Sequence, residues 1–412
     1  MKNKKLIGPI SQVVTMRNLP LKGALKDEQL EVISQAGILT DGEQILAIDS
    51  FETLRKKIDL TEVKRVDLNG NYVALPGLVD CHTHICFGGS RAQDFAMRNA
   101  GKTYLEIAQA GGGIWDTVTQ TRKLSSADLA KNTIMRANRH LQEGVTTIEV
   151  KSGYGLSILE EIKMLTAIHQ AQSKTKADLI ATCLAAHMLP KDYDGSAHSY
   201  LEEISQKLFP LLKKENLSGR IDAFIEKSAF SPDEIIPYFQ RAKEMGFEIT
   251  VHADQFSSGG SQAAIAAGAL SADHLEASTK EDIQRLAASD TIGVALPGAS
   301  IGLGCDFTAA RKLLDLGGAL AIATDWNPGS APMGDLIAQA SILATFEKLS
   351  TAEVFAAITF RAAAALGLDD RGKIEVGQKA DFILYPTSDY REILYHQGKF
   401  KPEQVWKNGL KI

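Results

Sequence analysis

Two local patterns alternate along the chain from about residue 76 to residue 366. Short apolar runs rich in Val, Ile, Ala and Leu each end in a polar cluster, and a longer amphipathic stretch follows. Runs of this length and composition are typical of strands buried on both faces of a parallel sheet. The eight runs span residues 78–84, 146–155, 181–187, 221–228, 248–254, 270–276, 292–300 and 320–328.

The stretches between the runs carry helix signals. Residues 125–144 combine helical periodicity with a serine suited to the N-cap and a glycine stop. Residues 231–246 begin with Ser231 as N-cap and Pro232 at the first helical position, and residues 351–367 form a third predicted helix. Eight strands joined by helices predict an α/β fold, a (β/α)8 barrel of the TIM type, with its active site at the C-terminal ends of the strands.

The two flanks of this region have a different pattern. Short alternating segments with Gly and Asp turns occupy residues 1–75, and similar segments occupy residues 371–412. These segments predict β-hairpins, and neither flank has enough apolar residues for a core of its own. We therefore predict that the two flanks pair into one small composite β-sandwich domain and that residues 76–370 form the barrel.

Composition narrows the classes of function. The chain has 412 residues and a formal charge of −5, with no basic run, which argues against a nucleic-acid partner. No stretch approaches the ~18 apolar residues of a membrane span, and Pro9, Ser11 and Gln12 interrupt the apolar N-terminal segment that a signal peptide needs. Four cysteines without a C-x-x-C motif favour a reducing compartment. These features predict a cytoplasmic protein that acts on a small molecule.

Candidate metal ligands stand at the ends of three predicted strands. His82 and His84 follow the first, and because strand side chains alternate, both face the same way. His252 closes the fifth and Asp325 the eighth, so all four residues surround one barrel mouth. Taken singly, each has an ordinary alternative: polar loop residues, a core histidine or a turn cap. Together, three imidazoles and one carboxylate suit Zn²⁺ or another borderline divalent ion, with a position left for water.

Other polar residues end the remaining strands. His274 closes the sixth and is predicted to hydrogen-bond the attacking water or the substrate carbonyl, with a fifth metal ligand as the alternative. Lys151 and Glu226 allow a bridge to a second metal, although a structural role for Lys151 is favoured. The four histidines outside this set are predicted to be solvated. They are His140, His169, His198 and His396.

The same mouth carries a candidate anion site. Arg91 follows the glycines of GGSR, Tyr154 follows the second strand and His187 ends the third. An arginine binds a carboxylate with two parallel hydrogen bonds, so these residues predict a pocket for a small carboxylate, with a surface or capping arginine as the alternative. The glycine-rich AGGGIWDT segment lacks the G-x-x-x-x-G-K-[ST] pattern of a phosphate loop.

Motifs spread over nearly the whole chain resemble those of the amidohydrolase superfamily. They are PGLVDCHTH, VHADQFSSGG, SADHLE and ATDWNPGSAP. Within the superfamily, four segments resemble motifs of the imidazolonepropionase family. They are GGSR, AGGGI, KSGYG and NPG. That resemblance implies hydrolysis of the cyclic amide C–N bond of 4-imidazolone-5-propanoate to N-formimidoyl-L-glutamate, the third step of L-histidine degradation. It also implies one Zn²⁺ or Fe ion per chain and a homodimer.

The resemblance carries site residues over to matching positions. The metal positions are His82, His84, His252 and Asp325; the catalytic positions are Asp325 and His274; the substrate positions are Arg91, Tyr104, Tyr154, His187, Gln255, Asn327, Gly329 and Ser330. Some relatives have Glu where this chain has Gln255, and a glutamine cannot serve as a general base, so proton transfer falls to Asp325 and His274.

Two other readings remain open. One is a different amidohydrolase, such as a purine or pyrimidine deaminase, whose neutral base would not require the cluster of Arg91, Tyr154 and His187. The other is an inactive structural relative, which would usually have lost a metal ligand. All four predicted ligands are present here.

Overall fold

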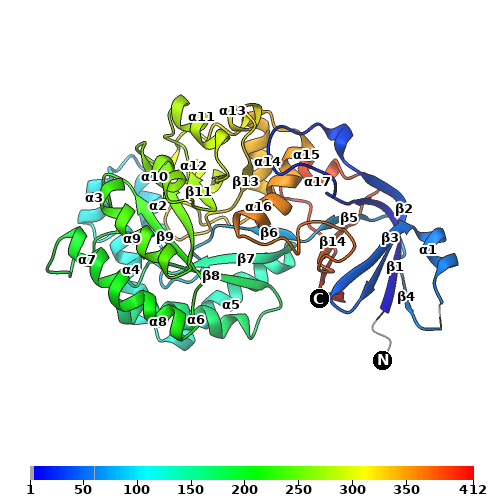
Figure 1. Cartoon of the computed structure of the whole chain (residues 1–412), viewed down its shortest axis with the longest axis horizontal. Helices are drawn as coiled ribbons and strands as arrows, with labels where there is room; N and C mark the ends of the chain where they lie inside the picture. The colour runs from blue at the N-terminus through cyan, green and yellow to red at the C-terminus, as the bar shows by residue number, and fades with distance from the viewer. Residues whose placement is uncertain (1–3, 60) are drawn as a thin grey trace.

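The computed structural model describes residues 4–59 and 61–412, apart from the side chains of residues 104 and 105, and it contains the predicted barrel (Figure 1). Eight strands follow one another around it in chain order, and each pairs in parallel with the next. They are β6 (Leu78–Asp80), β7 (Val145–Lys151), β8 (Asp178–Ala186), β9 (Arg220–Ile225), β10 (Glu248–Ala253), β11 (Ser271–His274), β12 (Ile292–Ala295) and β13 (Leu320–Ile322). Each predicted run holds one strand, and the fold class is confirmed.

The first and last strands meet just beyond their C-terminal ends. The backbone N–H of Asp325 donates to the carbonyl of His82 at 3.0 Å. Below this bond, the carboxylate of Asp80 accepts the N–H of Thr324 at 3.0 Å and its hydroxyl at 2.6 Å. One side chain therefore fastens β6 to the end of β13.

The predicted helices form where their caps indicated, with one exception. Ser125 accepts the N–H of Asp128 to begin α5 (Ser126–Gln142), and Ser231 caps α9 (Pro232–Glu244). The third predicted helix is two helices, α15 (Thr351–Ala357) and α16 (Phe360–Ala365). They break at Thr359, whose φ of −129° and ψ of −104° are not helical. The break lets the carbonyl of Ile358 accept the N–H of Val79 in β6 at 3.0 Å.

Further helices cover the barrel or join its strands. They are α2 (Ala92–Asn99), α3 (Tyr104–Gln109), α4 (Ile114–Lys123), α6 (Ile158–Gln172), α7 (Ala197–Glu203), η2 (Ile204–Leu208), α8 (Phe209–Lys214), α10 (Gly260–Ala266), α11 (Lys280–Ala288), α12 (Pro297–Leu303), α13 (Ala310–Asp315) and α14 (Leu336–Glu347). In the flanks lie α1 (Phe51–Lys57), η1 (Asp27–Gln29) and α17 (Glu392–Tyr395). Within the described part of the chain, no helix has the length and apolar character needed to cross a membrane.

Both flanks of the chain build the second sheet, seen in blue and red at one side of the barrel in Figure 1. Its strands are β1 (Lys4–Val14), β2 (Val32–Asp41), β3 (Gln44–Ser50), β4 (Lys64–Asp67), β5 (Val73–Pro76), β14 (Phe382–Tyr385), β15 (Gln404–Lys407) and β16 (Leu410–Lys411). The order is β16-β15-β14-β5-β1-β2-β3, with β4 beside β1. The antiparallel pair of β5 and β14 joins the two flanks, as predicted. The exact domain boundaries stay a prediction.

A cluster of charges ties this small domain to the barrel. Asp178, the first residue of β8, faces three cations from the C-terminal flank: Arg371 Nη1 at 2.6 Å, Lys407 Nζ at 2.9 Å and Lys379 Nζ at 3.1 Å. Burial raises the pKa of Asp178, but the three cations together hold it below the ordinary value of an aspartate. The carboxylate is therefore more stable as an anion in the folded chain than in the unfolded one.

We predict that Asp178→Asn lowers the free energy of unfolding at pH 7 by about 2–3 kcal/mol, because it leaves three cations partly unpaired in a mostly buried place. Since the folded-state pKa is depressed, this stabilisation is present above the unfolded pKa of about 3.9 and is lost as pH falls through the folded value. Denaturant unfolding of the wild type and Asp178→Asn between pH 3 and 7 measures the difference in their free energies of unfolding, which should shrink as the pH falls. The exposed Asp290→Asn is the control and should not shift the midpoint. Equal stability of wild type and Asp178→Asn at pH 7 would contradict the prediction.

Candidate metal and substrate site

A cavity of about 750 Å³ opens at the C-terminal ends of the barrel strands. Most of the predicted site residues line it: His84, Arg91, Tyr154, His187, His252, Gln255, His274, Asp325, Asn327, Gly329 and Ser330. His82 is fully buried against three other histidine rings of the set. Tyr104 begins α3, and its side chain lies outside the described residues. The structure thus brings together the dispersed residues that the sequence nominated.

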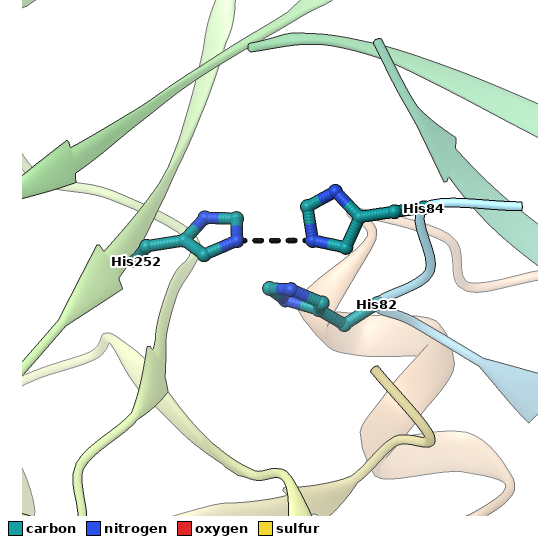
Figure 2. Close-up of side chains that lie close together, drawn as sticks. All are labelled: His82, His84 and His252. Carbon is teal, nitrogen blue, oxygen red and sulfur yellow. Dashed lines mark hydrogen bonds between the residues drawn. The ribbon is translucent and has the colours of Figure 1, made fainter. Parts of the chain in front are cut away.

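Three imidazole rings point toward one another, as Figure 2 shows, and two of them, those of His84 and His252, line the cavity. His82 and His84 come from the segment just after β6, and His252 from β10. Their candidate ligand atoms all lie within 4.8 Å of one another, and Nε2 of His252 lies 3.2 Å from Nε2 of His84. Asp325 Oδ1 lies 3.4 Å from Nε2 of His84 and 3.6 Å from Nε2 of His82.

Carboxylates lie against Nδ1 of two of these rings. Nδ1 of His82 donates to Asp273 Oδ2 at 2.6 Å, and because a proton on Nδ1 leaves Nε2 bare in a neutral ring, the Nε2 lone pair of His82 faces inward. Nδ1 of His252 lies 2.9 Å from Asp222 Oδ2 without a hydrogen bond, and Asp222 Oδ1 accepts the backbone N–H of His252 at 3.2 Å. Burial holds the pKa of all three histidines well below the ordinary value, which keeps the rings neutral. Neutral imidazole nitrogens around one carboxylate oxygen fit a divalent metal ion. The described residues contain no second group of this kind.

Asp325 and His274 stand beside this group. Burial raises the pKa of Asp325 to about 7. Burial also lowers the pKa of His274, but the nearby carboxylates of Glu276, Asp325 and Asp273 outweigh it and raise the pKa above the ordinary value. Both residues have left-handed backbones, with φ of +50° at Asp325 and +84° at His274. Such strain at non-glycine residues is typical of functional sites.

Arg91 enters the cavity from the segment after β6. Its Nε donates to Asp94 Oδ2 at 2.7 Å, and the same oxygen accepts the N–H of Gly113 at 2.8 Å. This contact leaves the other nitrogens of the guanidinium available. At Gly329, a Cβ atom would lie 2.5 Å from Arg91 Nη1, so only glycine permits this approach. The guanidinium is thus held by Asp94 and lies close against Gly329.

Tyr154 and His187 lie on the other side of the histidines. Their ring centres are 5.5 Å apart, and His187 stacks on His84 with centres 5.6 Å apart. Nδ1 of His187 donates to the carbonyl of Gly153 at 2.9 Å. Since a carbonyl oxygen only accepts, Nδ1 carries the proton, and Nε2 of the neutral ring is an acceptor. Burial lowers the pKa of His187 to about 4, so the ring is neutral at pH 7.

Several contacts were not anticipated from the sequence. Asp222 and Asp273 lie within barrel strands, where the alternation of side chains indicates that they face inward. That alternation does not indicate that Asp222 meets His252 and Asp273 meets His82. Glu226, considered for a second metal, accepts the N–H groups of Phe256 and Ser257 at 2.9 and 3.0 Å. It therefore holds the loop that carries Gln255.

The prediction of solvated histidines is right for three and wrong for His140. His169, His198 and His396 are exposed. His140 is fully buried on the inner face of α5, and its Nε2 lies 3.0 Å from Asp80 Oδ2. It lies three residues after the buried Ala137, on the helix face that covers the barrel.

The chain is similar to known proteins over nearly its whole length. The amidohydrolase family model matches residues 73–411. The imidazolonepropionase of Bdellovibrio bacteriovorus is 39% identical, over 99% of this chain and 96% of the relative. That of Fusobacterium nucleatum is 38% identical, over 97% of this chain and 96% of the relative.

Solved structures share the fold at lower identity. An atrazine chlorohydrolase from Arthrobacter aurescens complexed with zinc superposes with a TM-score of 0.73 at 18% identity, over 99% of this chain and 94% of that one. A guanine deaminase from C. acetobutylicum gives 0.72 at 16% identity, over 100% of both chains. At such identities the likeness concerns the fold alone.

We predict that His187 stays neutral, with its proton on Nδ1, until the pH falls to about 4. Burial disfavours the charged ring, so the midpoint lies below the ordinary histidine value of about 6.5. Nitrogen NMR of ¹⁵N-histidine-labelled protein reports both the tautomer and the midpoint, with the signal of His187 assigned from a His187→Gln variant. The exposed His198 provides a reference signal. A midpoint near pH 6.5, or a proton on Nε2 at pH 7, would contradict this assignment.

Proposed function

The chain belongs to the amidohydrolase family, and we propose that it acts there as an imidazolonepropionase. It hydrolyses the cyclic amide C–N bond of 4-imidazolone-5-propanoate and yields N-formimidoyl-L-glutamate, the third step of L-histidine degradation. The carrying observation is the pairing, in one cavity, of a histidine–aspartate group with a fixed arginine, in a chain 38–39% identical to imidazolonepropionases over nearly its full length.

We assign one metal ion, Zn²⁺ or Fe, to His82, His84, His252 and Asp325. The neutral nitrogens and the single carboxylate oxygen support this assignment. A bound metal supplies Lewis-acid chemistry, which makes water a better nucleophile at neutral pH and polarises the carbonyl group under attack.

Two residues handle protons in this proposal. Oδ1 of Asp325 faces the histidines, so Oδ2 takes the proton of the attacking water. Burial raises the pKa of this carboxyl, which favours its acceptance of a proton that it then returns. His274 donates a hydrogen bond to the oxygen of the ring carbonyl, where negative charge develops. Asp325 then delivers the proton to the leaving ring nitrogen.

The remaining residues hold the substrate. Arg91 binds its propionate, because this guanidinium is fixed by Asp94 and faces the cavity. His187 accepts a hydrogen bond through its bare Nε2, which suits a ring N–H of the substrate and disfavours direct contact with its carboxylate. We assign the other substrate contacts to the remaining residues that the sequence resemblance nominated. They are Tyr104, Tyr154, Gln255, Asn327, Gly329 and Ser330. A homodimer in the cytoplasm completes the proposal.

We predict that purified protein holds about one metal ion per chain and that His252→Ala loses it. Removal of one of three neutral nitrogen ligands weakens binding enough for dialysis against a chelator to strip the metal. Elemental analysis measures the content, and loss of absorbance of imidazolone propionate measures activity, with guanine as the substrate of the alternative. The exposed His169→Ala is the matched control and keeps both. A His252→Ala protein with full metal content would overturn the ligand assignment.

We predict that Arg91→Met lowers kcat/KM for imidazolone propionate by about 10- to 100-fold while metal content is unchanged. The range corresponds to a charge-assisted contact of roughly 1.5–3 kcal/mol that fixes the reacting ring. Arg91→Lys keeps the charge but loses the paired donors, so it should also be impaired. Lys102→Met, at an exposed cation of the cavity rim, is the control and should change kcat/KM little. Wild-type kcat/KM for Arg91→Met would show that the carboxylate binds elsewhere.

A further inference from the structure

A fully buried lysine in the barrel interior contacts carboxylates that reach the candidate metal group. Lys151, the last residue of β7, has no solvent exposure. Its Nζ donates to Glu149 Oε1 at 2.8 Å, lies 2.8 Å from Asp222 Oδ2 and lies 3.8 Å from Asp273 Oδ2. A buried ammonium among three buried carboxylates is costly unless each contact is well placed.

Two of these carboxylates reach the histidines through the same atoms that face the lysine. Asp222 Oδ2 lies 2.9 Å from Nδ1 of His252, and Asp273 Oδ2 accepts Nδ1 of His82 at 2.6 Å. One ammonium is therefore linked to two imidazoles through single shared oxygen atoms. The third carboxylate, Glu149, accepts the hydroxyl of Thr182 at 2.5 Å through Oε1, the same oxygen that accepts from the lysine.

The topology explains why one lysine can serve both rings. Lys151, Asp222 and Asp273 come from β7, β9 and β11, which are alternate strands of the barrel. Side chains from alternate strands share one layer of a barrel interior. The histidines come from the strands between and beside them, so each carboxylate spans from the lysine layer to the metal-binding rings.

We propose that Lys151 is a positioning residue for the metal site. Its ammonium fixes Asp222 and Asp273, which lie against Nδ1 of His252 and His82 and keep Nε2 of both rings turned inward in the metal-free protein. The inference rests on the proposed metal site and adds a residue that touches neither metal nor substrate. Carboxylates that orient metal-binding histidines typically change metal affinity by about 10- to 100-fold when they are altered.

The test is the Zn²⁺ affinity of the full chain, measured by competition with a chromogenic chelator, with Co²⁺ absorption spectra as a second readout of ligand geometry. Lys151→Met keeps the side-chain length without the charge and should bind Zn²⁺ about 10- to 100-fold more weakly. Lys407→Met is the matched control: Lys407 is also buried and lies between two carboxylates, Asp178 at 2.9 Å and Asp381 at 2.7 Å. It should bind Zn²⁺ within twofold of wild type.

A double variant separates the effect of the lost contacts from the effect of the changed net charge. It also provides the test if Lys151→Met alone does not fold. Lys151→Met with Glu149→Gln restores the net charge of the buried group but not the contacts to Asp222 and Asp273. Affinity that stays about tenfold weaker, with an altered Co²⁺ spectrum, supports the proposal. Wild-type affinity of either Lys151 variant, or equal weakening by Lys407→Met, overturns it. Wild-type protein that binds no Zn²⁺ would instead refute the proposed function.

Discussion

The contacts that close the barrel also bring the site together. Three of the four proposed metal ligands lie where the first and last strands meet: His82 and His84 follow β6, and Asp325 follows β13. The bond from the Asp325 N–H to the His82 carbonyl closes the backbone there, and Asp80 fastens the two strands just below. Since this seam lacks a regular ladder of hydrogen bonds, the ligands are correctly spaced only in the closed barrel.

This arrangement places an unusual number of charged groups in the interior. Burial raises the pKa of Glu149 to about 7 and that of Asp273 to about 6, although Lys151 opposes both shifts. Buried ion pairs seldom add net stability, because desolvation offsets their attraction. The apolar helices and strand faces around the barrel must therefore supply the folding free energy, while the polar interior fixes a geometry. The buried charges therefore fix the positions of the side chains around the site and do not add stability.

The sequence predicted the strands, the cap residues and the ends at which His82, His252 and Asp325 lie. These features depend on local patterns: apolar runs, N-cap serines and period-two alternation. It did not predict which carboxylate meets which histidine, because that pairing depends on strand stagger around a closed barrel. The burial of His140 and the break at Thr359 were missed for a related reason. Each depends on contact with a distant part of the chain, Asp80 in one case and Val79 in the other.

The strained backbone at the two proposed proton-handling residues shows how the loops support the chemistry. A left-handed non-glycine residue costs roughly 1–3 kcal/mol and persists only where neighbouring contacts fix it. The hydroxyl of Thr308 donates to the backbone carbonyl of His274. At Asp325, the amide of Asn327 does the same at 2.7 Å.

Asn327 uses the rest of its amide on the same loop. Its Oδ1 accepts the N–H groups of Gly329 and Ser330 at 2.7 and 2.8 Å, and its Nδ2 also donates to the Ser330 hydroxyl. The side chain therefore acts first on the backbone: it holds Asp325 in its strained conformation and sets Gly329 against Arg91. One asparagine thus couples the position of the proposed proton acceptor to that of the proposed carboxylate anchor, at opposite ends of the substrate.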